Sequence, residues 1–291
     1  MAVNRDKPDR WKRDIARSVD MYNAWFLEFA PQAFRTTRIQ TTKDVESALK
    51  ATSNLTSIQP TILREHPEVL PTLRMSTCPP LAVDRLIGLA QASPALVKRM
   101  ENEKKLPSRM SPKQLDGELR RIGAIIERMA DPDIFVWLGR GKPPSDAEVY
   151  RAATIVADRL CGAVANPIIR NAQEQRQLAA IGGWLQARGY RELRAEEQAE
   201  FGTMPPGTYE FRMNVPANLQ GGTKQVNIPV DVAIMPKSVR QRDFPIFLEA
   251  KSAGDFANVN KRRKEEAQKM AQLRGTYGDK VRYHLFLCGY F

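Results

Sequence analysis

Cysteine and histidine are scarce in this sequence of 291 residues, which has three of the first and two of the second. So few thiols, spaced so widely, cannot form the disulfide framework of a small secreted domain. With only His66 and His284 beside them, they also make no metal-ligand cluster of the zinc type. We therefore expect the cysteines to be buried, reduced thiols: Cys78, Cys161 and Cys288.

Long apolar runs are also lacking. The longest run, Leu285 to Phe291, has the length of a strand, whereas a membrane-spanning helix needs roughly 20 apolar residues. The N-terminus alternates charges where a signal peptide would have an apolar segment. We therefore expect a cytoplasmic protein with no membrane partner.

Acidic residues are too few to balance the basic ones. The chain has 45 lysines and arginines against 33 acidic residues, a net charge of +12. Such a balance favours a polyanionic partner, nucleic acid first and an anionic membrane second. Hydrophobic residues at 42% and charged residues at 27% are ordinary values for a globular protein, and the length fits about two domains.

The first 165 residues have the pattern of helices separated by proline-marked loops. Apolar side chains recur at spacings of three and four between Ile15 and Phe29 and predict a helix that ends at Pro31. We assign residues 1–165 to a helical region. Its further helices are expected at about 42–51, 81–101, 112–129 and 145–164.

From Asn166 onward the pattern changes to one helix followed by strands. The final strand is almost continuously apolar, as expected for a strand buried on both faces. The order helix, three strands, helix, strand predicts an α+β or α/β domain over residues 166–291. Its elements are expected at about 168–187, 208–215, 226–235, 244–251, 259–277 and 282–290.

The alternation of side chains along two of these strands brings acidic residues to one face. In the strand 226–235 the apolar positions are Ile228, Val230, Val232 and Ile234. Successive side chains point to opposite faces, so Asp231 lies on the other face. The same argument places Glu249 and Lys251 on the face opposite Leu248. If the strands pair as an adjacent hairpin, Asp231 and Glu249 come within reach of one metal ion.

Two carboxylates and a lysine in this arrangement fit phosphodiester hydrolysis. Magnesium is typically held by one or two carboxylates and keeps its other positions for water and phosphate oxygens. Lys251 can donate to the attacking water or to the phosphate, and its pKa can shift beside carboxylates. The interpretation of Asp231, Glu249 and Lys251 as surface charges remains the alternative. Glu174, in the preceding helix, is a further candidate metal ligand or a solvent-facing acid, and Glu210 is a weaker candidate.

A basic segment follows directly after the second of these strands. Four cations lie at a helix start, where the helix dipole favours acids, so local stability does not explain them. One interpretation is contact with DNA phosphates and base edges; the other is a solvated helix face, helped by Glu265 and Lys269 at i, i+4. The residues expected to bind DNA are Ser252, Asn258, Asn260, Lys261, Arg262, Arg263 and Lys264.

These features resemble a known group of enzymes. The order of core elements with Asp231, Glu249 and Lys251 resembles the PD-(D/E)xK nuclease superfamily. Longer stretches are similar to the XamI-type family of type II restriction endonucleases. They are Ser18–Phe26, Cys78–Leu86, Ala157–Gly162, Asn166–Glu174 and Glu249–Phe256, the last of which continues into the basic segment.

The resemblance implies Mg²⁺-dependent cleavage of double-stranded DNA at a short palindrome, with a GTCGAC-like site suggested by the family's type member. It also implies a homodimer, a cognate DNA methyltransferase in a restriction-modification system, and a place at the prokaryotic nucleoid. Two features depart from the family pattern: Val230 separates Pro229 from Asp231, and the sequence stops at Phe291, where we expect the family to continue. Two alternatives stay open, a repair or junction-resolving nuclease of the same superfamily and a DNA-binding module without catalysis.

Overall fold

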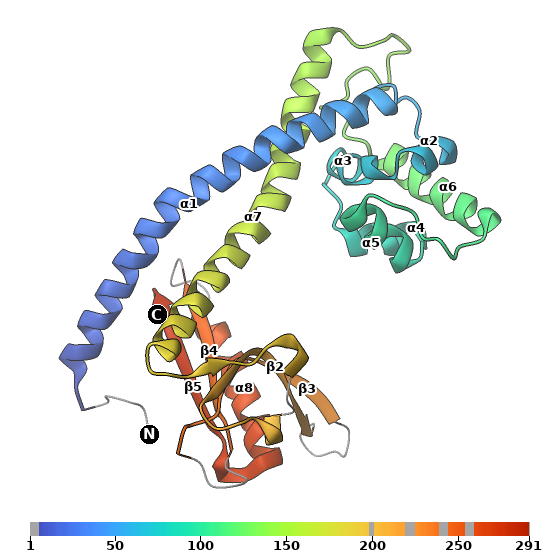
Figure 1. Cartoon of the computed structure of the whole chain (residues 1–291). Helices are drawn as coiled ribbons and strands as arrows, with labels where there is room; N and C mark the ends of the chain where they lie inside the picture. The colour runs from blue at the N-terminus through green and yellow to red at the C-terminus, as the bar shows by residue number, and fades with distance from the viewer. Residues whose placement is uncertain (1–5, 198–200, 219–224, 239–243, 254–258, 291) are drawn as a thin grey trace. The chain divides into compact units, whose positions relative to one another are not determined.

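The computed structural model describes residues 6–197, 201–218, 225–238, 244–253 and 259–290, with the backbone alone at 195, 201 and 259–263. The chain divides into two compact units (Figure 1). Residues 31–168 form one, the helical unit; residues 1–30 and 169–291 form the other, the sheet unit. The boundary at residue 168 lies three residues from the expected one, but the first 30 residues group with the C-terminal unit.

Two long helices run from one unit into the other. They are α1 (Pro8–Ala51) and α7 (Asp146–Gln186), and each contains an internal proline, Pro31 in α1 and Pro167 in α7. The predicted helix end at Pro31 and the predicted break before residue 168 are therefore wrong. The φ angle of proline suits a helix. Inside a helix, proline removes one backbone hydrogen bond and its ring crowds the preceding turn, but packing of the helix before and after the proline can outweigh this cost.

Among the described helices, α7 alone contains a stretch that is long and apolar enough to cross a membrane by composition. Core helices of water-soluble proteins meet the same criterion, and 39% of this stretch is buried. The composition of α7 therefore gives only weak support for a membrane segment.

The helical unit has one apolar core, to which α1 and α7 contribute Leu49 and Val156. Where one helix was predicted over 81–101, the structure has two. The break occurs because Gln91 adopts the left-handed conformation with φ of 47° and Ser93 then caps the next helix by accepting a hydrogen bond from Leu96 N. The shorter helices of this unit are α2 (Pro60–Glu65), α3 (Leu70–Met75), α4 (Val83–Ala90), α5 (Pro94–Glu103) and α6 (Pro112–Met129).

The sheet unit contains a mixed five-stranded sheet in the order β1-β2-β3-β4-β5. The central strands β2, β3 and β4 are antiparallel, whereas the two edge strands lie parallel to their neighbours. This architecture confirms the predicted helical region followed by an α+β core. Its elements are β1 (Arg191–Glu192), β2 (Thr208–Asn218), β3 (Gln225–Ile234), β4 (Ile246–Ala253), α8 (Val259–Tyr277) and β5 (Arg282–Gly289). Short 3₁₀ turns occur at Pro67–Val69, Ala195–Glu197, Phe201–Thr203 and Gly278–Lys280.

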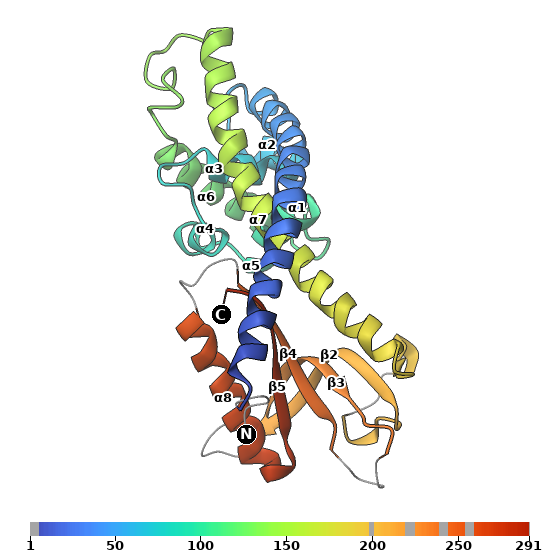
Figure 2. The same cartoon turned by 90° about the vertical axis from the view of Figure 1, so that its left-hand side faces the viewer.

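Helices cover both faces of this sheet. Figure 2 shows α8 on one side and the C-terminal end of α7 on the other. On the α8 side, Leu273 belongs to a buried cluster with Phe247 of β4. On the α7 side, Leu178 and Leu185 belong to a second cluster with Val232 of β3. The sheet is therefore the middle layer of three within this unit.

Strand β3 changes face at Asp231. Ile228 and Val230 pack in the cluster on the α8 side, whereas Val232 and Ile234 pack on the α7 side. The predicted single apolar face is therefore wrong. Arg212 of β2 lies opposite Asp231 and has a φ of 57°. The strand positions on either side of these two residues are paired, but Arg212 and Asp231 themselves are not. A local twist of both strands at this point reverses the alternation.

Strand β5 lies at the edge of the sheet, and the prediction that it is buried on both faces is also wrong. Leu285, Phe286 and Leu287 are 44%, 39% and 45% exposed. A continuous apolar run is typical of a strand buried on both faces, but it does not show whether the strand has a neighbour on each side. The end of β5 contacts helix α1, where Ser18 Oγ accepts a hydrogen bond from Gly289 N at 3.2 Å.

Candidate active site

The candidate site lies where β3 and β4 stop pairing. The last paired residues are Val232 and Leu248, and beyond them Asp231 Oδ2 accepts a hydrogen bond from Ala250 N at 2.8 Å. The Asp231 carboxylate therefore takes the place of the next backbone acceptor in the ladder. This bond fixes the side chain at the fork between the two strands.

Glu249 is the most deeply buried acid of the site, with its side chain 2% exposed. Its Oε1 accepts hydrogen bonds from Lys251 Nζ and from Lys269 Nζ of α8, each at 2.6 Å. Its Oε2 is buried and has no hydrogen-bond partner among the described residues. A buried carboxylate oxygen without a partner is costly, so this atom is suited to a ligand.

A second buried acid, Glu266 of α8, faces the same lysines. Its Oε1 lies 3.2 Å from Lys251 Nζ and 3.9 Å from Lys269 Nζ. Tyr283 of β5 donates a short hydrogen bond to its Oε2. No pattern in the sequence predicts this role for Glu266, Lys269 or Tyr283, and Lys269 is expected there only as a partner of Glu265. Their three-residue spacing places Glu266 and Lys269 on one helix face, but no strand pattern indicates where that face points.

Burial and neighbouring charges shift the pKa of Asp231 and of Lys251. Burial first, and then the negative charge of Glu249, raise the pKa of Asp231, with the Ala250 N–H and the lysines acting in the opposite direction. Burial lowers the pKa of Lys251, but the hydrogen bond to Glu249 and the charges of three acids outweigh it and raise the pKa. Lys251 is therefore an ammonium donor in this state of the protein.

Asp231 and Lys251 also border a cavity of about 270 Å³ between the sheet and α7. Gln177 of α7 donates a hydrogen bond to the Lys251 carbonyl at 3.0 Å and so ties the helix to β4. The other lining residues are Ala250 and Ser252 of β4 and Arg170, Gln173 and Glu174 of α7.

The two other predicted acids, Glu174 and Glu210, do not belong to this cluster. Glu174 lines the cavity, but its Oε1 forms an ion pair with Arg212 Nη2 at 2.8 Å on a half-exposed surface. Glu210 does not line the cavity. It is buried on β2, and burial raises its pKa. The structure therefore brings Asp231, Glu249 and Lys251 together, with Glu174 at the border and Glu210 apart from them.

The predicted DNA-binding segment is described only in part. Ser252 lines the cavity and Lys264 is exposed on α8. Asn258 lies outside the described residues, and so do the side chains of Asn260, Lys261, Arg262 and Arg263, whose backbone belongs to the start of α8. The assignment of this segment to DNA stays a prediction.

The donor set of the site fits magnesium. No group of three or more His, Cys, Asp or Glu side chains among the described residues is arranged to hold a metal ion. Magnesium usually needs only one or two protein carboxylates, because water and substrate phosphates complete its shell. Asp231 and Glu249 supply two, and the unpartnered Glu249 Oε2 provides a donor atom.

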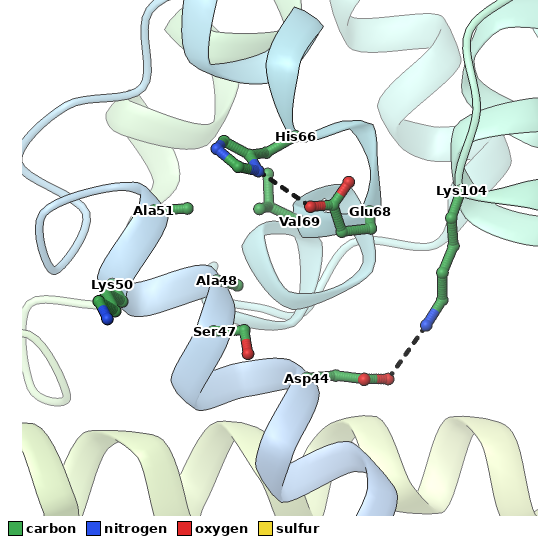
Figure 3. A pocket seen from close by; sticks show the side chains of 9 residues that line it. All are labelled: Asp44, Ser47, Ala48, Lys50, Ala51, His66, Glu68, Val69 and Lys104. Carbon is green, nitrogen blue, oxygen red and sulfur yellow. Dashed lines mark hydrogen bonds and ion pairs between the residues drawn. The ribbon is translucent and has the colours of Figure 1, made fainter.

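A larger cavity, of about 590 Å³, lies in the helical unit (Figure 3). Four of its polar side chains form two pairs. Lys104 Nζ lies 3.3 Å from Asp44 Oδ2, and His66 Nδ1 lies 3.0 Å from Glu68 Oε1. Because these groups already contact one another, this cavity is a weaker candidate for a site of chemistry than the sheet unit.

Comparison with known proteins decides the family. The model of the XamI restriction endonuclease family matches residues 53–291. The chain belongs to this family. A curated relative, type II restriction enzyme SalI of Streptomyces albus G, is 50% identical over 289 residues, which cover 99% of this chain and 90% of the relative. No solved structure matches significantly. As a member of the XamI family the chain is a restriction endonuclease, and the predicted class of site-specific deoxyribonuclease is confirmed.

Proposed function

We propose that this restriction endonuclease hydrolyses both strands of a short palindromic DNA site in a Mg²⁺-dependent reaction at the fork between β3 and β4. The observation that carries the proposal is the convergence of Asp231, Glu249 and Lys251 there. Asp231 Oδ2 accepts a hydrogen bond from Ala250 N at 2.8 Å, and Lys251 Nζ lies 2.6 Å from Glu249 Oε1. The family resemblance favours a GTCGAC-like target.

In this proposal Asp231 and Glu249 hold the metal ion. Glu249 can offer Oε2 to the ion while Oε1 keeps its two lysines. When bound, Mg²⁺ would polarise the phosphodiester and lower the pKa of a coordinated water. Glu174 can become a further metal ligand only if its carboxylate gives up the ion pair with Arg212.

Lys251 acts in this proposal as a hydrogen-bond donor. Its raised pKa keeps the ammonium protonated, so it can orient the attacking water or stabilise negative charge on the phosphate rather than remove a proton. A compact ammonium provides several donors without the fixed plane of a guanidinium. Lys251 also borders the cavity shared with α7, where a DNA phosphate can approach.

The basic segment after β4 and the helical unit complete the proposal. Ser252, Asn258, Asn260 and Lys261 to Lys264 would contact DNA directly beside the cleaved bond. Because each site cuts one strand, a palindromic target calls for a homodimer with two-fold symmetry. The helical unit would contribute to dimer contacts or DNA wrapping. A cognate methyltransferase would protect host DNA, and the enzyme would work in the prokaryotic cytoplasm at the nucleoid.

The test is cleavage of a long defined DNA by the purified protein with Mg²⁺, followed by sequencing of the fragment ends. We expect every end to fall within one palindromic sequence and no cleavage when EDTA replaces Mg²⁺. A parallel panel of mismatched and branched DNA should remain uncut. Cleavage confined to branched or mismatched DNA would support a repair or junction nuclease instead, and binding without cleavage would support the non-catalytic alternative.

A further inference from the structure

One oxygen of Glu249 accepts two ammonium groups. Lys251 approaches Glu249 Oε1 from the same strand and Lys269 from α8, each at 2.6 Å. Two positive charges on one acceptor repel each other. Glu249 alone therefore does not fix the position of Lys251, and another group must oppose the repulsion.

Glu266 is that group. Its Oε1 lies 3.2 Å from Lys251 Nζ and 3.9 Å from Lys269 Nζ, and its side chain is 6% exposed. The four side chains thus alternate in sign: two acids and two lysines. Without Glu266, Glu249 would be the only acid among the described residues within ion-pair distance of either lysine, and breaking a buried ion pair is strongly destabilising.

Both oxygens of Glu266 are engaged, in contrast to those of Glu249. Tyr283 donates a hydrogen bond to Glu266 Oε2 while Oε1 faces the lysines. Glu249 Oε2 has no partner in the described structure. One acid is therefore held rigidly, and the other keeps an oxygen for a ligand. This difference assigns the two buried acids to different tasks.

We propose that Glu266 is a positioning residue for Lys251, with Tyr283 holding the Glu266 carboxylate. The residue touches neither metal nor DNA and acts by fixing the Lys251 ammonium beside Glu249. The proposal rests on the proposed function, because the role of Lys251 in cleavage gives its position a purpose. Helix α8 then supplies part of the active site as well as the expected DNA-binding surface.

The first test measures the lysine itself in metal-free protein. Glu266→Gln keeps the shape of the side chain and removes its charge, and Glu265→Gln, at the exposed neighbouring position of α8, is the matched control. We expect the ¹⁵Nζ resonance of Lys251, assigned by its loss in Lys251→Met, to shift or broaden in Glu266→Gln and to stay unchanged in the control. This readout does not depend on cleavage.

The second test measures single-turnover cleavage at saturating DNA with Mg²⁺. Loss of a group that supports an active-site residue typically lowers activity about 10- to 100-fold, so we expect this drop in Glu266→Gln, with DNA affinity unchanged. Glu266→Asp, which restores the charge, should recover part of the rate. The Glu265→Gln control should cleave at the wild-type rate.

A wild-type Lys251 resonance together with a wild-type rate in Glu266→Gln would overturn the proposal. If that variant does not fold, Tyr283→Phe replaces it, because it keeps the charge of Glu266 and removes the hydrogen bond that holds this carboxylate. A shifted Lys251 resonance in Tyr283→Phe supports the proposal, and an unchanged resonance overturns it. If the wild-type protein cleaves no DNA, the proposed function fails, whereas the resonance still decides whether Glu266 positions Lys251.

Discussion

Asp231 and Ala250 are joined across the fork between β3 and β4 by a hydrogen bond of 2.8 Å from the Ala250 N–H to the Asp231 carboxylate. The carboxylate thus has two separable properties, an acceptor oxygen that closes the end of the ladder and a negative charge that a metal ion can use. Substitutions that remove one property and keep the other can test the assignment of Asp231.

Asp231→Asn keeps an acceptor for Ala250 N–H and loses the charge. Because burial and the charge of Glu249 raise the Asp231 pKa, the ionised form is disfavoured in the folded protein. We expect Asp231→Asn to unfold no more readily than wild type in EDTA, measured by urea denaturation, and to cleave no DNA. Asp231→Ala should lower the free energy of unfolding by about 1–3 kcal/mol, because Ala250 N–H loses its acceptor. Wild-type cleavage by Asp231→Asn would remove Asp231 from the site.

Charge balance around Glu249 predicts a rescue. Glu249→Gln leaves Glu266 as the only acid among the described residues within ion-pair distance of Lys251 and Lys269, and breaking a buried ion pair in this way costs about 3–5 kcal/mol. In the double variant Glu249→Gln, Lys269→Gln, one lysine again faces one acid, so stability against urea should return while cleavage stays lost. A double variant no more stable than the single one would contradict the four-group arrangement.

The proposed DNA contact of the basic segment can be tested at Lys264, because its side chain is exposed on α8. If it contacts a phosphate, Lys264→Ala should weaken DNA binding for all sequences and reduce the slope of log affinity against log salt by about one. Fluorescence anisotropy over a salt series measures both effects. Lys280→Ala, at an exposed lysine in the 3₁₀ turn after α8, is the control. Equal slopes in the two variants would favour the solvated-face interpretation.

The N-terminus of α7 predicts a dependence of stability on pH. Glu148 Oε2 accepts a hydrogen bond from Ser145 N at 2.9 Å, and both Glu148 oxygens accept from Arg140, at 2.8 and 2.9 Å. The Arg140 hydrogen bonds, followed by the Ser145 N–H, lower the Glu148 pKa from 4.5 to about 2. Folding favours the ionised form, so its contribution is complete above pH 4.5 and is lost as pH falls through about 2.

We therefore expect Glu148→Gln to melt at a lower temperature than wild type at neutral pH and the difference to shrink between pH 4.5 and pH 2. Calorimetry over this range measures it. Ser145→Ala, which removes the helix cap, should lower the free energy of unfolding by about 1 kcal/mol. A melting difference that stays constant down to pH 2 would show that the Glu148 charge does not act at this helix end.

Local patterns in the sequence predicted the strands on which the three candidate site residues lie. Period-two alternation identified the strands of Asp231, Glu249 and Lys251, and the bounds of α8 agree with the helix predicted over 259–277. Alternation could not show the twist at Asp231, because apolar residues occupy both sides of it. The positive φ of Arg212, a non-glycine residue, has no sequence signature.

What the sequence could not show depends on tertiary packing. The roles of Glu266 and Lys269 depend on the side of the sheet that α8 covers, and the role of Tyr283 depends on β5 lying beside β4. Local rules end a helix at proline, but α1 continues through Pro31 and has contacts before it, at Ser18, and after it, at Leu49. In each case a contact distant in sequence determines the outcome.

The hydrogen bond between Ser18 and Gly289 spans 271 residues, and this separation bears on how the protein is made. A ribosome produces α1 early and the end of β5 late, whereas residues 31–168 form a contiguous unit that can fold during synthesis. The sheet unit, which carries the candidate cleavage site, contains parts of both α1 and β5. It can therefore be completed only after β5 has been translated, later than the helical unit.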